Sequence, residues 1–312
     1  MRKILITGGA GYVGGAITDL LAQNSDYQIR VYDSLLYEDT FRKPVEFVHG
    51  DVLDIEKLKP HLDWADTVVW LAALVGDGAC QINPDITVKL NQEAVKTLAD
   101  NFDGRIIFMS TCSVYGAQNS MLDESSGTSP LSLYAATKLK AEDYLKDKNA
   151  IIFRLGTLFG VGDCYSRIRM DLVVNILTAK AIEHGKINVF GGDQFRPLLH
   201  VKDVARAVAQ NIDSPHVGIF NLMQENKRII DLACDVQSHF DTCTIVTTDV
   251  PFQDTRNYRV SCEKAKSCFG FSPIYDVNYG VKELKSLIMA GRIKNLDDER
   301  YSNARYLQER LY

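Results

Sequence analysis

The sequence predicts an α/β protein in which a doubly wound parallel sheet is joined to a smaller lobe built from discontinuous α/β pieces. Through about residue 160, short apolar runs alternate with segments of helical periodicity, which is typical of parallel strands joined by right-handed crossovers. After that point the regularity fades, although residues 203–212 and 218–220 are expected to return a helix and a strand to the first sheet. With 312 residues, 46% of them hydrophobic, the chain is long enough to bury such a core.

Each element is predicted from its own apolar pattern. The expected strands cover residues 3–7, 28–33, 45–49, 67–72, 105–110 and 150–155. The expected connecting helices cover residues 12–23, 54–61, 85–101 and 132–147. Further along the chain we expect a mostly apolar helix near 168–183, a strand near 187–190 and a loop at 191–197.

The first apolar run ends in a glycine-rich turn, Gly8-Gly9-Ala10-Gly11-Tyr12-Val13-Gly14-Gly15, and a helical pattern follows. In such a strand, turn and helix, Gly8 permits the tight turn, Gly11 lets a pyrophosphate approach the backbone, and Gly14 packs the helix against the strand. Free amides at the helix N-terminus then form an anion site. The pattern favours a Rossmann-type dinucleotide-binding fold, although turns and helix ends also collect glycine for purely structural reasons.

The end of the second strand indicates which dinucleotide is bound. Asp33 lies roughly 20 residues past the glycines, where a carboxylate accepts hydrogen bonds from both ribose hydroxyls of an adenosine. A 2′-phosphate would be repelled there, so the predicted cofactor is NAD rather than NADP. Asp51 closes the third strand and is either a partner of the adenine amino group or an ordinary turn residue.

Small residues follow the fourth strand. Ala72 and Ala73 leave space for a bound cofactor, although small side chains also suit plain helix packing. Asn91 lies in the next expected helix. It is either a buried amide that braces the neighbouring strand ends or an ordinary solvated residue of the helix.

The composition excludes several classes of protein. A net charge of −5 and a pI near 5.7 give no basic footprint for nucleic acid or an anionic membrane. The sequence contains no run of about 18 apolar residues, so we expect no membrane span. The first expected strand begins at residue 3, so we expect no signal peptide. We therefore expect a cytoplasmic enzyme. The seven cysteines are odd in number and form no Cys-x-x-Cys pair, so we expect reduced thiols, no disulfide framework and no metal site.

A tyrosine and a lysine four residues apart, Tyr134 and Lys138, lie on one face of an expected helix. A phenol has a pKa near ~10, and lowering it to ~7 requires roughly 4 kcal/mol of extra stabilisation of the phenolate. The Lys138 ammonium and an oxidised nicotinamide ring are able to supply it. Hydroxyl groups at the end of the fifth strand, in the run Ser110-Thr111-Cys112-Ser113, are able to bind a sugar oxygen and pass its proton to the tyrosine. Each signal alone also fits an ordinary helix or turn.

Together these motifs resemble the extended short-chain dehydrogenases/reductases of the nucleotide-sugar epimerase/dehydratase family over nearly the whole chain. The matching segments are residues 7–14, 71–73, 110–116, 134–138, 153–160, 195–205 and 254–261. The resemblance implies that Thr111, Tyr134 and Lys138 are catalytic. It also implies cofactor contacts from Gly8, Gly11, Tyr12, Val13, Asp33, Asp51, Val52, Leu71, Ala72, Ala73, Tyr134 and Lys138.

The same resemblance implies the substrate site. Arg196 and Arg256 match positions that hold the nucleotide diphosphate, for which a guanidinium has suitable geometry, although both also fit ordinary surface arginines. Thr111, Cys112 and Ser113 are expected to contact the sugar.

Departures from the family pattern narrow the reaction. Family 4,6-dehydratases carry an acidic pair directly after the catalytic threonine, whereas this chain has Cys112 and Ser113, so dehydration is disfavoured. Cys112 is either a thiolate that deprotonates a carbon beside a transient ketone or a small buried side chain. Thr157 replaces the usual asparagine, which alters the expected contacts to the diphosphate. Residues 167–171 resemble the cap helix of enzymes that modify GDP-heptoses.

From these expectations the leading hypothesis is an NAD-dependent epimerase that acts on a nucleotide-diphosphate sugar through a transient 4-keto intermediate. The alternatives are a 4-dehydrogenase or keto-sugar reductase, with a GDP-heptose as one candidate substrate, and, less favoured, a 4,6-dehydratase or a non-catalytic NAD-binding protein. The resemblance also implies a homodimer and a place in polysaccharide biosynthesis. We expect residues 1–160 and 201–222 to bind NAD and residues 161–200 and 223–312 to form the nucleotide-sugar-binding lobe, with the cleft between them.

Overall fold

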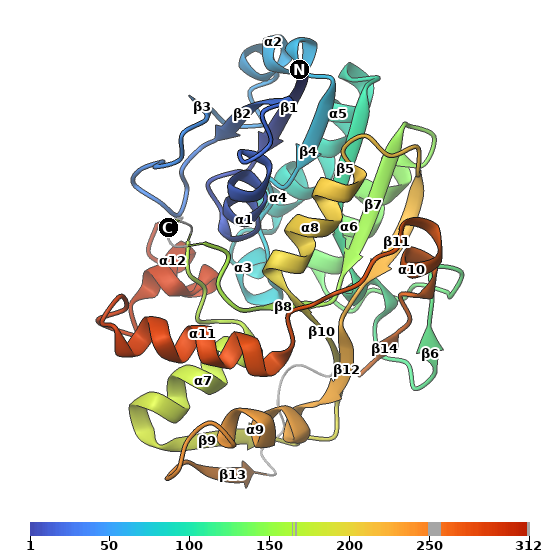
Figure 1. Cartoon of the computed structure of the whole chain (residues 1–312). Coiled ribbons are helices and arrows are strands. Elements are labelled where there is room, and N and C mark those ends of the chain that lie inside the picture. Colours follow the sequence, from blue (N-terminus) through green and yellow to red (C-terminus); the bar gives the residue numbers. More distant parts are fainter. Residues whose placement is uncertain (164, 166, 249–256, 311–312) are drawn as a thin grey trace.

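The computed structural model describes residues 1–163, 165, 167–248 and 257–310. Its centre is a seven-stranded sheet in the order β11-β7-β5-β4-β1-β2-β3, in which every neighbouring pair is parallel. Its strands are β1 Arg2–Thr7, β2 Tyr27–Asp33, β3 Glu46–His49, β4 Thr67–Trp70, β5 Arg105–Thr111, β7 Ala150–Leu155 and β11 Gly218–Leu222. This arrangement confirms the predicted fold class and the return of residues 218–220 to the sheet (Figure 1).

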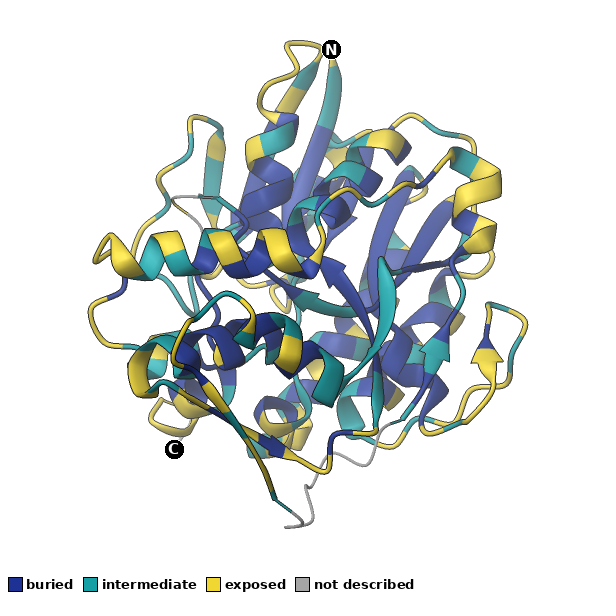
Figure 2. Cartoon of the chain, turned by 60° about the horizontal axis from the view of Figure 1, so that its bottom comes forward, coloured by how far each residue is buried: buried dark blue, intermediate teal, exposed yellow. Residues whose placement is uncertain are grey.

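Helices cover both faces of this sheet. One face packs against α1 (Tyr12–Leu21) and α8 (Val201–Asn211), and the other packs against α2 (Ile55–Trp64), α5 (Ala94–Asn101) and α6 (Leu133–Leu145). In β1, Ile4 and Ile6 enter the first apolar core and Leu5 enters the second, as the two-residue period of a strand requires. Because both faces are covered, the strands read as continuous apolar runs, and Figure 2 shows them buried beneath exposed outer helix faces.

A second group of elements lies at one end of the sheet. The three-stranded sheet β12-β10-β8 and the pair β13-β9 lie here with helices α7, α9 and α11, around a core of their own (Figure 1). The bounds are β8 Thr157–Phe159, β9 Lys186–Phe190, β10 Phe195–His200, β12 Glu225–Arg228, β13 Thr244–Thr248, α7 Val173–His184, α9 Ile229–Gln237 and α11 Val277–Met289. The proposed division into two ligand-binding parts stays a prediction.

Shorter elements complete the chain. They are α3 Asp77–Ile82, α4 Pro84–Val88, a π-helical turn Lys89–Glu93, 3-10 turns at Cys112–Tyr115 and Glu299–Tyr301, α10 Glu263–Phe269, α12 Asn303–Gln308, and the paired strands β6 Met121–Leu122 and β14 Arg259–Val260. No helix among the described residues is long and apolar enough to span a bilayer.

Two expected elements are corrected. The loop expected at 191–197 ends early, because Phe195 starts β10. Pro197 is tolerated there because the ladder with β8 begins only at Leu198, so no strand bond on that side needs a proline N–H. The helix expected near 168–183 begins only at Val173, after the extended residue Leu172. The expected cap helix at 167–171 is therefore not helical.

Candidate active site

A cavity of about 1300 Å³ opens at the carboxyl ends of the central strands. Its wall combines the turn after β1, the ends of β2, β4, β5 and β7, the start of α6, and parts of α7, β9 and β10. Pockets for a single small ligand occupy about 300–1,000 Å³, so this cavity has room for a dinucleotide and a second ligand. The position is the one that open parallel sheets use for ligand binding.

The glycine turn has the geometry predicted for it. Gly8 has φ +73°, and a Cβ at this position would lie 2.7 Å from the backbone nitrogen of Ala72, so only glycine fits between the two strand ends. A Cβ on Gly14 would lie 2.3 Å from the carbonyl oxygen of Gly8, so this glycine allows the helix to pack on the strand. Within the described part of the chain no side chain caps the start of α1, and residues 11–14 at this helix end line the cavity. An uncapped helix N-terminus is suited to binding an anion. These features fit the pyrophosphate of a dinucleotide.

Asp33 ties the end of β2 to this turn. One carboxylate oxygen accepts a hydrogen bond from the Ala10 amide (2.9 Å) and the other from the Leu35 amide (2.8 Å). Burial raises the pKa of Asp33, and the two amide bonds oppose that shift. Asp33 lines the cavity with Asp51 and Val52, so the cofactor contacts expected of these three residues stay predictions. The charge of Asp33 disfavours a 2′-phosphate at this place.

The residues after β4 form the cavity wall opposite the glycine turn. Leu71, Ala72 and Ala73 all line the cavity. Asn91 braces the next residue, Leu74: its Oδ1 accepts from the Leu74 amide (2.8 Å) and its Nδ2 donates to the Leu74 carbonyl (2.9 Å). Asn91 is fully buried and lies in the π-helical turn, a distortion that often marks functional sites. The expectation that a buried amide braces the strand end is confirmed.

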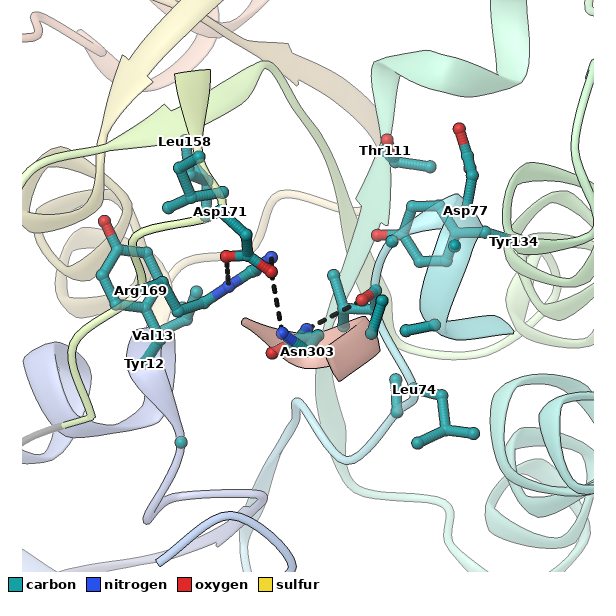
Figure 3. Close-up of a pocket in the computed structure, with 18 of the residues that line it drawn as sticks. Tyr12, Val13, Leu74, Asp77, Thr111, Tyr134, Leu158, Arg169, Asp171 and Asn303 are labelled. Atoms are coloured by element: carbon teal, nitrogen blue, oxygen red, sulfur yellow. Dashed lines mark hydrogen bonds and ion pairs between the residues drawn. The ribbon is translucent and has the colours of Figure 1, made fainter. Parts of the chain in front are cut away.

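The three predicted catalytic residues all line the cavity. Thr111 ends β5, and Tyr134 and Lys138 lie one turn apart on α6, whose start is capped by Ser132 (Figure 3). The Thr111 hydroxyl donates to Ser113 Oγ (3.1 Å).

Lys138 lies one helical turn after Tyr134 on α6, and its side chain is buried. Its ammonium nitrogen lies 4.7 Å from the centre of the Phe108 ring. Burial lowers the pKa of Lys138 to about 8, and Cys80 and Glu142 limit the shift. The lysine therefore remains cationic at neutral pH, as stabilisation of a tyrosinate requires.

A buried network behind these residues escaped the sequence analysis. Glu142, one turn beyond Lys138, forms an ion pair with Arg154 of β7 and accepts a hydrogen bond from Ser110 of β5. The Arg154 guanidinium also lies 4.9 Å from the centre of the Tyr115 ring. The only sequence signal was the four-residue spacing from Lys138 to Glu142 along the same helical face.

The structure corrects the role expected for Cys112. Its thiol is fully buried outside the cavity wall and donates to the Arg154 carbonyl at 3.2 Å. Burial raises the pKa of this thiol well above its usual range, which disfavours a thiolate. Cys112 therefore neither contacts the cavity nor serves as a base, whereas Ser113 does line the cavity.

Of the two arginines expected at the diphosphate, the structure describes only Arg196. Arg196 lies on β10, is buried, and lines the cavity, with one guanidinium nitrogen donating to the Phe195 carbonyl at 2.9 Å. Its position is compatible with an anionic ligand. Arg256 lies outside the described residues.

A further polar cluster joins distant segments beside the glycine turn. Arg169 forms a two-pronged ion pair with Asp171 (2.9 and 3.1 Å), which holds the pKa of Asp171 below its usual range against the effect of burial. Asp171 accepts a hydrogen bond from the backbone N–H of Asn303 (2.9 Å), and the side-chain amide of Asn303 donates one to the Val75 carbonyl (2.8 Å) (Figure 3). Arg167 also donates to Asn303. Ser302, Asn303 and Ala304 thereby complete the cavity wall.

Comparisons with known proteins agree on one family. The model of the NAD dependent epimerase/dehydratase family matches residues 4–222. A UDP-glucose 4-epimerase of Corynebacterium glutamicum is 26% identical over 302 residues, covering 87% of this chain and 91% of that protein.

Two solved structures have the same fold at low identity. The Thermotoga maritima UDP-glucose 4-epimerase with UDP-glucose has a TM-score of 0.81 and 22% identity, covering 94% of this chain and 100% of that one. The Bacillus cereus UDP-glucuronic acid 4-epimerase in complex with UDP-glucuronic acid and NAD has a TM-score of 0.78 and 24% identity, covering 92% and 100%.

Proposed function

The chain belongs to the NAD dependent epimerase/dehydratase family, and we propose that it is a 4-epimerase of a nucleotide-diphosphate sugar. The observation that carries this proposal is the position of Thr111, Tyr134 and Lys138 in one cavity with the glycine turn. Cofactor and sugar thus have room side by side, with a proton acceptor available to the sugar. Bound NAD supplies the acceptor and the donor of a hydride.

The protein side chains have separate tasks in this reaction. Tyr134 accepts the proton of the sugar's C4 hydroxyl as the C4 hydrogen leaves as a hydride, and it returns the proton when the resulting ketone is reduced on its other face. Lys138 stabilises the negative charge on Tyr134, because its buried ammonium remains protonated at neutral pH. Thr111 holds the C4 oxygen by a hydrogen bond.

The same arrangement disfavours dehydration. Elimination of water needs an acid and a base beside the ketone, and the two positions after Thr111 carry Cys112 and Ser113. A buried thiol whose pKa is raised cannot act as a base near neutral pH, and a serine hydroxyl is a weak base as well.

The second candidate is a dehydrogenase or reductase that releases its cofactor in every cycle. The contacts of Asn303 support the epimerase, because they hold residues 302–304 in the cavity wall, where we expect them to slow cofactor exchange. Arg196 is proposed to bind the diphosphate. A homodimer and a role in polysaccharide biosynthesis stay predictions.

Three measurements on one preparation test the proposal. Mass spectrometry of small molecules released by denaturation should recover NAD at a near-stoichiometric level. Incubation with UDP-, GDP-, dTDP- and CDP-hexoses should convert one of them to its 4-epimer by NMR, without stoichiometric growth of NADH absorbance. Accumulation of NADH in step with product would establish the dehydrogenase instead, and a lack of any conversion would rule out catalysis on these sugars.

A further inference from the structure

The catalytic side of the cavity contains a carboxylate that the proposed reaction does not use. Asp77 is the first residue of α3 and lines the cavity, and Figure 3 shows it on the same side as Thr111 and Tyr134. Helix α3 packs on α6, where Tyr134 contacts an apolar cluster that includes Ala79 and Cys80. This packing sets the first turn of α3 beside the catalytic tyrosine.

Helix α3 brings a single charge to the cavity wall. The residues of α3 that line the cavity are Asp77, Gly78, Ala79 and Gln81, which contribute one negative charge and no positive charge. Lys138 on α6 also lines the cavity, and its side chain is buried. Arg167 and Arg169 are engaged with Asn303 and Asp171 near the glycine turn, and Arg196 lies on β10.

We propose that Asp77 selects a neutral sugar and rejects a uronate. Its carboxylate accepts hydrogen bonds from sugar hydroxyls, which are donors, whereas a carboxylate on the sugar offers only acceptors and a like charge. This inference rests on the proposed function and narrows its substrate class. The solved relatives leave the choice open, because one contains UDP-glucose and another contains UDP-glucuronic acid.

The test measures binding to the NAD-loaded enzyme by calorimetry with two matched pairs of ligands. These are UDP-glucose with UDP-glucuronate and GDP-mannose with GDP-mannuronate, so that within a pair only the C6 group differs. For the pair whose nucleotide is accepted, the neutral sugar should bind about tenfold or more tightly, because like charges in an interface are costly. Asp77→Asn should bring the two affinities within about threefold, mainly by improving uronate binding.

A matched control separates this local effect from a change in net charge. Asp85→Asn removes the same charge from the exposed first turn of α4, outside the cavity, and should leave the affinity ratio of the wild type unchanged. In the wild type, added salt should shrink the ratio, because ions screen the repulsion. This second measurement needs no variant, so it holds even where Asp77→Asn fails to fold.

The outcomes are distinguishable. Equal wild-type affinities for the neutral sugar and the uronate, or a ratio that neither salt nor Asp77→Asn changes, overturn the role of Asp77 and leave the proposed function standing. Binding of none of the four ligands overturns the proposed function and this inference together.

Discussion

Glu142 and Arg154 form an ion pair with both side chains buried, in which Arg154 Nη2 lies 2.6 Å from one carboxylate oxygen and Nε lies 3.0 Å from the other. The pair connects α6 to β7, and the hydrogen bond from Ser110 adds β5. It therefore sets the position of Tyr134 and Lys138 relative to Thr111.

Removing one partner of this pair should destabilise the protein strongly. Glu142→Ala leaves Arg154 as an uncompensated buried charge, so the free energy of unfolding should fall by about 3–5 kcal/mol, measured by urea denaturation. Asp100→Ala, which breaks an exposed ion pair with Lys96 on α5, should cost no more than about 1 kcal/mol. Similar losses in the two variants would contradict a structural role for the buried pair.

Tyr134→Phe should lower kcat by about 10²–10⁴-fold, because it removes the group that carries the proton of the sugar hydroxyl. NAD should remain bound, as measured by mass spectrometry of the denatured protein. Tyr144→Phe, on the same helix but outside the cavity, should have near-normal turnover. Near-normal turnover of Tyr134→Phe would remove this residue from the catalytic assignment.

The buried ammonium of Lys138 predicts a pH dependence of stability. Its pKa is about 8 in the folded protein against an ordinary value of 10.5, so between these values the unfolded chain binds more protons. Stability should therefore rise with pH in that window and reach its full value above pH 10.5. Between pH 8 and pH 10.5 the free energy of unfolding of the wild type, measured by urea denaturation, should rise by up to about 3 kcal/mol relative to that of Lys138→Met. A flat difference between the two proteins would contradict the shifted pKa.

Cys112→Ala should leave kcat within about twofold and cost about 1 kcal/mol of stability, because the thiol fills a buried site and takes no part in the reaction. In the native protein a thiol reagent should label the exposed Cys234 and Cys268 and spare Cys112. Peptide mass spectrometry separates these sites. Loss of activity on labelling of Cys112 would restore the thiolate hypothesis.

Asn303→Ala should release NAD about 5- to 30-fold faster, because each lost hydrogen bond contributes roughly 1 kcal/mol to holding the segment in place. The rate is measured as the loss of bound NAD after dilution, monitored by mass spectrometry of the retained cofactor or by the loss of activity. Gln308→Ala, at an exposed position of the same helix, is the control and should release NAD at the wild-type rate.

Much of the sheet was predictable because its information is local. Strands buried on both faces read as apolar runs, and the four-residue spacing of Tyr134 and Lys138 places both on one helical face. The glycine turn was predictable as well, because the spacing of Gly8, Gly11 and Gly14 between a strand and a helix is visible in the sequence.

The rest depended on contacts between distant segments. Asn303 and Asp171 are 132 residues apart, and neither lies in a pattern that names its partner. Arg154 lies in an apolar strand, where only the fold reveals that Glu142 compensates its charge. The sequence also did not determine whether the Cys112 side chain faces the cavity or the core, because successive side chains at a strand end point in opposite directions.

The order of synthesis gives the contacts of Asn303 one more consequence. A chain emerges N-terminus first, so the glycine turn and most of the central sheet are available to fold while residues 302–304 have yet to be made. During that interval the dinucleotide cavity lacks part of its wall and stands open to solvent. Loading of NAD should therefore become durable only late in biosynthesis, once Asn303 reaches Val75 and Asp171.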